Sequence, residues 1–445
     1  MVFPEDCECI EARTAQLSFH DTVTIDTSMG TFTNEDLSPL NGLRSPPYTF
    51  EFTRKANSVI DLRHTLLEVR FNVVNAKGEP VSRDNDNFRP RDLAVVGNPI
   101  SSLWKRIETH LNDKLINIES SRNIPHKGIF EDWLDLRNDE RAHPQGVRNK
   151  YFIGHGPHKN NFYNTYEHSR GKLNDGLTMQ YVGHVPVDFL RVNNYLAPRT
   201  LLTLTFHPHS SDYALMHAET PGHKIIITDL MLLIRRIYPA AELLPQLPQL
   251  GQDTREQYCG RFGTVRDYQM PEGSLRWTQH VIRGDGLLPK FVLVGMVNAE
   301  IFGGGVKGSA KRQDPCYFHH YDLNHLSLRA GDTHHPAKPY SPRRMGTTSG
   351  GMREYYSMFE QTGLLHPFVT MKEYTHGATI FPFNLRPDMS TLHSRVLFPP
   401  KHGPLTIELG FEKPLAHTVS LVVYLLYDQV ISIQGTSGFP VEQQF

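Results

Sequence analysis

The same succession of strand patterns, with one short helix, occurs twice along the chain. Each half has a strongly alternating strand, then a hairpin, a helix and closing strands. The matched positions, first half then second, are Leu67 and Phe291, Ile129 and Met352, Leu202 and Leu405, and Ile226 and Val419. Self-similarity in a fixed order indicates a duplicated structural unit. The chain is therefore expected to fold as two copies of one architecture.

Alternation of apolar and polar residues predicts half-buried strands through both halves. In the first half the expected strands are 48–52, 67–73, 107–111, 114–118, 179–190, 200–206 and 224–235. In the second half they are 290–294, 326–329, 379–385, 405–411 and 419–427. Asn112-Asp113 predicts a tight hairpin turn, and 330–332 its counterpart. Helical spacing predicts short helices at 129–136 and 352–359, the second ended by Gly363.

Many short strands with 33 glycines, 31 prolines and only two clear helices indicate an all-β protein. The fold class expected is two tandem eight-stranded jelly rolls, a double jelly roll, with a few short helices. The pattern predicts an N-terminal arm at 1–45 and a first jelly roll at 46–238. A Pro- and Leu-containing linker at 239–257 is followed by a second jelly roll at 258–433 and a tail at 434–445.

The charge balance gives no bulk reason for binding nucleic acid. There are 46 Lys and Arg against 47 Asp and Glu, a formal net charge of −1. The basic spots are isolated pairs: Arg235-Arg236, Lys311-Arg312 and Arg343-Arg344. They are interpreted as solvated surface or subunit contacts, without direct sequence-specific recognition of nucleic acid.

No run of 18 apolar residues occurs, so no transmembrane segment is expected. The N-terminus lacks the apolar region of a signal peptide, which favours synthesis in the cytosol. The four cysteines, Cys7, Cys9, Cys259 and Cys316, are too few for a disulfide scaffold and are expected to be reduced.

The jelly-roll fold also occurs in oxygenases and cupins, so we ask whether the histidines match the metal-binding patterns of these enzymes. His320-Tyr321-Asp322 with His376 and Arg386 imitates the facial triad of an iron/2-oxoglutarate oxygenase and its cosubstrate arginine. Chance alone gives about 2.5 His-x-acid triplets in this composition. Two occur, the other being His217-Ala218-Glu219. The triplet is therefore not evidence of a metal site.

Three further patterns are incomplete. His207-Pro208-His209 is cupin-like but lacks a correctly spaced glutamate. Cys316, His319 and His320 lack a fourth zinc ligand, and Gly303–Gly308 departs from the phosphate-loop templates. We expect no catalytic, cofactor-binding or metal-binding residues, and hence no enzyme and no cofactor.

With both halves laid out, residues 45–433 resemble the major capsid proteins of Polinton (Maverick) elements and adintoviruses, including animal proteins derived from them. The segments that carry the resemblance in the first half are 61–73, 99–104, 111–112 and 229–236. In the second half they are 288–302, 320–328, 353–363, 374–388, 405–411 and 422–431. Two departures are Asn112-Asp113, where the family prefers Asn-Gly, and the neutral tail after Ile433.

The resemblance implies a major capsid protein whose homotrimers are pseudo-hexagonal capsomers that tile an icosahedral virus capsid. It implies contacts with neighbouring capsomers and with penton and minor capsid proteins, and a place in the virion. The His-, Asn-, Arg- and Tyr-containing segment 137–178 is the candidate for intersubunit or outward-facing contacts. The alternatives are a jelly-roll iron/2-oxoglutarate oxygenase or cupin-like enzyme, and a lectin-like binding module.

Overall fold

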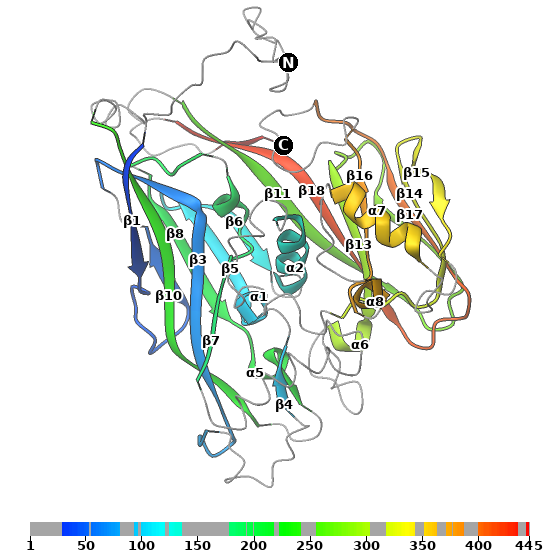
Figure 1. The fold of residues 1–445 in the computed structure, drawn as a ribbon, viewed down its shortest axis with the longest axis horizontal. Coiled ribbons are helices and arrows are strands. Elements are labelled where there is room, and N and C mark those ends of the chain that lie inside the picture. The colour runs from blue at the N-terminus through cyan, green and yellow to red at the C-terminus, as the bar shows by residue number, and fades with distance from the viewer. Residues whose placement is uncertain are drawn as a thin grey trace, which may run out of the picture.

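The computed structural model describes two β-sandwiches side by side (Figure 1). The described residues are 29–52, 55–80, 93–96, 99–120, 124–135, 178–192, 194–198, 200–217, 222–241, 255–302, 317–342, 351–362, 371–375, 377–386, 399–434 and 442–444. We call the two sandwiches the first roll and the second roll.

The first roll consists of two facing antiparallel sheets. One has the order β1 (Met29–Leu37), β10 (Lys224–Pro239), β3 (Val59–Val74) and β7 (Met179–Gly183). The other has the order β2 (Tyr48–Glu51), β8 (Leu202–Pro208), β5 (Trp104–Leu111) and β6 (Lys114–Ser120). A small pair, β4 (Leu93–Val95) and β9 (Leu215–His217), lies beside them.

The second roll repeats this arrangement. One sheet has the order β11 (Arg255–Met270), β18 (Val419–Gln434), β13 (Phe291–Asn298) and β16 (Ile380–Asn384), and β19 (Glu442–Gln444) adds to β18. The other has the order β12 (Arg276–Ile282), β17 (Leu405–Phe411), β14 (Leu323–Ala330) and β15 (Thr333–Tyr340).

Both rolls therefore have the same topology. With β4, β9 and β19 set aside, each roll places its first, eighth, third and sixth strands in one sheet, and its second, seventh, fourth and fifth in the other. This is the strand order of a jelly roll. The double jelly roll expected from the sequence is confirmed, and so are the four matched positions, which lie on corresponding elements.

Helices occupy corresponding positions too. α1 (Pro99–Ser102) and α6 (Ala299–Phe302) follow β4 and β13, each leading toward the roll's fourth strand. Between the fifth and sixth strands lie α2 (Ile124–Asp135) in the first roll and α7 (Met352–Thr362) with α8 (Met371–Thr375) in the second. The first roll also has a 3-10 turn, η2 (Asp188–Arg191), and α5 (Ser211–Ala214).

Two expectations were wrong in part. Met29–Leu37 was assigned to an arm but forms β1, which pairs with β10 at the sheet edge. Its pattern was obscured because an edge strand exposes most side chains, as Thr31 and Phe32 are here. The strand expected at 179–190 ends at Gly183, and η2 follows it.

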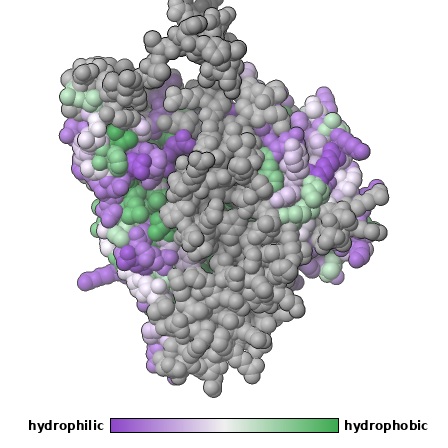
Figure 2. Space-filling view, viewed as in Figure 1, coloured by the Kyte–Doolittle hydropathy of each residue, from purple (hydrophilic) through white to green (hydrophobic). Residues whose placement is uncertain are grey.

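Each roll has its own apolar core between its sheets. In the first roll Phe50, Leu67 and Leu204 are fully buried, and in the second Val292, Leu326 and Ile407 are. Burial of one such side chain contributes about 1.5–3 kcal/mol. Figure 2 shows hydrophobic patches among polar side chains on the left, over β1 and β10, and mainly polar side chains on the right.

Candidate functional site: the contact between the two rolls

The helix α2 belongs to the first roll but packs into the second. Its Ile129, Phe130 and Leu134 are buried among the core residues of the second roll. The ring of Phe130 lies 5.3 Å from that of Phe318 and 5.7 Å from that of Tyr424. Apolar residues on one side of a short helix thus hold the two sandwiches together.

A buried ionic cluster lies beside this apolar contact. Lys127 Nζ is 2.8 Å from Asp188 Oδ2 and 3.7 Å from Glu131 Oε1. Arg191 Nε is 3.2 Å from Glu131 Oε2. The side chains of Lys127, Glu131 and Asp188 are all at most 3% exposed. Buried charges are tolerated only when paired, so this cluster requires a defined geometry.

The second roll completes the cluster. The hydroxyl of Tyr424 on β18 donates to Glu131 Oε1 at 3.4 Å, and the backbone N–H of Gly263 on β11 donates to Asp188 Oδ1 at 3.2 Å. A Cβ at Gly263 would lie 2.2 Å from the Tyr424 hydroxyl oxygen. Glycine is therefore required where β11 passes Tyr424.

The cluster holds Glu131 ionised. Burial raises the pKa of Glu131, but the nearby positive charges of Arg191, Lys127 and Arg261 outweigh burial, and its pKa is lowered. The contact between the rolls therefore contains a permanently charged carboxylate at neutral pH.

The second roll reaches into the first in return. Strands β11 and β18 pair over their full length, from Arg255 opposite Gln434 to Met270 opposite Val419. Near one end, Tyr258 and Ile431 belong to the core of the first roll. The Tyr258 ring lies 5.3 Å from that of Phe189, and its hydroxyl accepts from the Ala197 N–H at 3.2 Å. This two-way contact is not predicted by any pattern in the sequence.

The structure places His320-Tyr321-Asp322 in a tight turn before β14. Tyr321 and Asp322 have φ of 47° and 50°, and the Asp322 N–H donates to His320 Nδ1 at 3.0 Å. Arg386 instead pairs with Asp428 of β18, with Nη2 at 2.7 Å from Oδ2. His376 lies outside the described residues.

Two further candidate histidines have structural partners. His207 Nε2 lies 3.2 Å from Glu108 Oε1, and the ring of His209 stacks on Tyr213 at 4.0 Å. His217 ends β9, and its triplet partner Glu219 lies outside the described residues. No three His, Cys, Asp or Glu side chains in the described part of the chain could hold a metal ion.

Several sequence patterns cannot be placed. The residues outside the described part of the chain include Cys7, Cys9, Cys316, the glycine loop 303–308, the pairs Lys311-Arg312 and Arg343-Arg344, and all of the segment 137–178 except Thr178. Cys259 is half-buried on β11, and burial raises the pKa of its thiol. None of the helices described is long and apolar enough to cross a membrane.

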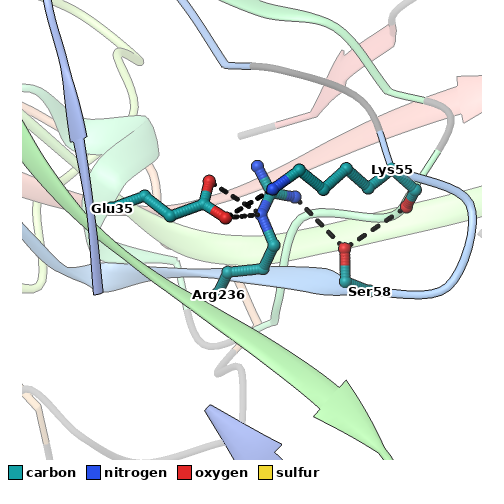
Figure 3. A network of polar contacts seen from close by, with 4 residues as sticks. All are labelled: Glu35, Lys55, Ser58 and Arg236. Atoms are coloured by element: carbon teal, nitrogen blue, oxygen red, sulfur yellow. Dashed lines mark hydrogen bonds and ion pairs between the residues drawn. The ribbon is translucent and has the colours of Figure 1, made fainter. Parts of the chain in front are cut away.

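Arg235 and Arg236 point to opposite faces of their sheet. Arg236 is fully buried, and its Nε donates to both Glu35 oxygens at 3.0 Å; Ser58 and Lys55 complete the network (Figure 3). Arg235 lies over the ring of Phe32 at 5.2 Å. The pair is therefore no basic patch, because one member is an internal ion-pair partner that fixes β1 to β10.

Comparison with known proteins supports the fold and leaves the family open. No family model matches the sequence. An uncharacterized protein of Caenorhabditis elegans is 22% identical over 412 residues, covering 87% of this chain and 91% of the relative.

Two viral structures are similar over almost the whole chain. A chain of the Sputnik virophage is 12% identical with a TM-score of 0.54, over 98% of this chain and 93% of its own. A chain of the PBCV-1 virus capsid is 11% identical with a TM-score of 0.54, over 96% and 100%. This chain therefore has the double jelly-roll fold found in these viral structures.

Proposed function

We propose that this chain is a major capsid protein of the Polinton and adintovirus type, whose homotrimers are pseudo-hexagonal capsomers. The observation that carries the proposal is the two-roll body: two rolls of identical topology joined by the buried contact around α2. Each roll is one domain, and the division lies between the end of β10 at Pro239 and the start of β11 at Arg255, within the linker expected at 239–257. Because each chain contributes a rigid pair of similar rolls, three chains together would have six similar rolls and approximate sixfold symmetry.

The physical role follows from that geometry. A ring of three two-roll chains presents six similar sides, so each capsomer meets its neighbours through repeated head-to-tail contacts. Such contacts extend into a closed icosahedral shell, with penton and minor capsid proteins at the positions that the trimer does not fill. The protein would act in the virion as structural material, without a catalytic centre.

The test is the size and shape of the purified full-length protein. Light scattering should give a particle of three times the 50.8 kDa chain mass. Negative-stain images should show threefold blocks with a hexagonal outline. A monomer at micromolar concentration would contradict the proposal, and so would turnover on addition of iron(II) and 2-oxoglutarate.

A further inference from the structure

The second roll's β11-β18-β13-β16 sheet is buried on both faces. Val423 and Leu425 of β18 face the sandwich core, and the alternate residues Val422 and Tyr424 face the opposite way. All four are 0% exposed. The outer side is covered by Phe318 and by Phe130 of α2, which comes from the first roll. Within one chain, a helix of one roll thus covers the sheet of the other.

The corresponding face of the first roll has no such helix over it in the described part of the chain. Met231 and Leu233 of β10 face outward, because Leu230 and Leu232 belong to the core. Ile226 also faces outward, because its neighbours Ile225 and Ile227 pack against the core and a β-bulge follows them. Ile226 is 47% exposed, and Met231 and Leu233 are partly exposed. At the far end Phe32 of β1, opposite Ile237, is 61% exposed. We call these four residues the open face. Figure 2 shows hydrophobic surface among polar side chains on this side of the molecule, over β1 and β10.

The carboxylate of Glu68, beside the open face, already has its partners. Glu68 lies directly opposite Met231 and is 8% exposed. It pairs with Arg70 at 2.7 Å and accepts from Gln180 at 2.6 Å. A partner could therefore cover this face without leaving a carboxylate unpaired.

The second roll carries a helix of the matching kind. α7 occupies the same position in its roll as α2 does in the first, between the fifth and sixth strands. Its inner side is buried through Met358 and Phe359. Its outer side carries Met352, 59% exposed, and Tyr356, 66% exposed, one helical turn apart. Large apolar side chains at this exposure are typical of contact surfaces.

We propose that the α7 outer side of one chain docks on the open face of a second copy of this chain. In this contact α7 would cover a sheet of another chain, in the same way as α2 covers the second roll's sheet within one chain. It joins two different surfaces and is therefore heterologous, so it generates a closed ring when the rotation closes. In a ring of three copies, helix-on-sheet contacts within a chain would then alternate with helix-on-sheet contacts between chains. The proposal rests on the proposed function and names the surfaces that hold the trimer together.

One variant on each surface tests the contact. Tyr356→Glu places a charge on α7, and Met231→Lys places a cation opposite Glu68, where the free chain tolerates it. Both would bring a charge into the docked contact, where the charge loses its hydration. The matched controls are Leu275→Glu, at a site 48% exposed in the β11–β12 turn, and Thr203→Lys, half-buried on β8 of the other sheet. Circular dichroism checks that all four are folded.

The expected result by light scattering is a trimer for the wild type and both controls, and a monomer for each of the two surface variants. A 1:1 mixture of Tyr356→Glu and Met231→Lys should give a dimer, because one intact α7 and one intact open face remain between them. Trimers that persist in both variants, or a mixture that stays monomeric, overturn the inference while leaving the capsid proposal standing. A monomeric wild type overturns both.

Discussion

The ring of Phe130, on α2 of the first roll, lies 5.7 Å from the ring of Tyr424, on β18 of the second. Both side chains are 0% exposed. This pair joins the core of the second roll to a helix that comes from the first. Neither roll is therefore complete without the other, and changes at this contact should affect the whole molecule.

Replacing Phe130 with alanine should destabilise the protein by about 3–5 kcal/mol, the range for removing a buried aromatic side chain. Because the cavity opens between the rolls, the loss should appear in a single unfolding transition. Urea unfolding at fixed protein concentration measures it. Leu275→Ala, at an exposed turn position, is the control and should change stability by less than about 0.5 kcal/mol. An equally small effect of Phe130→Ala would contradict the role given to α2.

The hairpin between β5 and β6 offers a stabilising change. Asn112 and Asp113 have φ of 46° and 64°, the positive values that a type I′ turn requires. Asp113→Gly should stabilise the chain by about 0.5–1 kcal/mol, because glycine adopts such φ values without steric cost. Asn112 is kept because its side chain accepts from the Leu201 N–H at 2.9 Å. Thermal unfolding gives the comparison, and a lower midpoint for Asp113→Gly would show that Asp113 is not strained.

Strands in which apolar residues alternate with other residues could be predicted from the sequence. The alternation in β3 and β17 and the turn at Asn112-Asp113 follow from local chemistry, so their positions were found and the repeat emerged from them. β1 was missed because as an edge strand it buries almost nothing on either face. β11 was missed because two of its residues, Gly263 beside Tyr424 and Arg261 beside Glu131, serve the contact between the rolls and interrupt the alternation of the strand.

The contact itself had no local signal. Lys127 and Glu131 are one helical turn apart, a spacing that ordinarily marks a solvated helix face. Their partners, Asp188, Arg191 and Tyr424, are distant in sequence, and nothing in the spacing relates them. Only the folded arrangement of the two rolls shows that these charges are buried.

Glu131→Gln should be strongly destabilising at neutral pH. Removal of one charge from a buried ion cluster leaves its partners unbalanced, a loss of about 3–5 kcal/mol. The pKa of Glu131 is lowered in the folded state, so the stability that its ionised form contributes is present above pH 4.5 and lost as the pH falls through the folded pKa. The difference in unfolding free energy between wild type and Glu131→Gln should therefore become smaller below pH 4.5. Chemical unfolding at a series of pH values from 7 to 3 measures this difference. For the control Glu412→Gln, at an exposed position, the difference in unfolding free energy should stay near zero.

Lys290 should give a pH dependence of the same sign, but in the alkaline range. Its amine pairs with Asp428, which Arg386 also contacts, and its side chain is 11% exposed. Burial is the largest influence and lowers its pKa from 10.5 to about 8. Unfolding therefore takes up a proton between pH 8 and 10.5, so the cost of burying the charged amine is full below pH 8 and relieved above it. Relative to that of Lys290→Met, the unfolding free energy of the wild type should rise by on the order of 3 kcal/mol across this window. Subtracting the variant's unfolding free energy at each pH cancels the titration of the buried tyrosines. For Lys413→Met, whose lysine is 78% exposed, the difference in unfolding free energy from the wild type should not change with pH. If the difference for Lys290→Met did not change with pH either, the Lys290 amine would stay protonated in the folded protein.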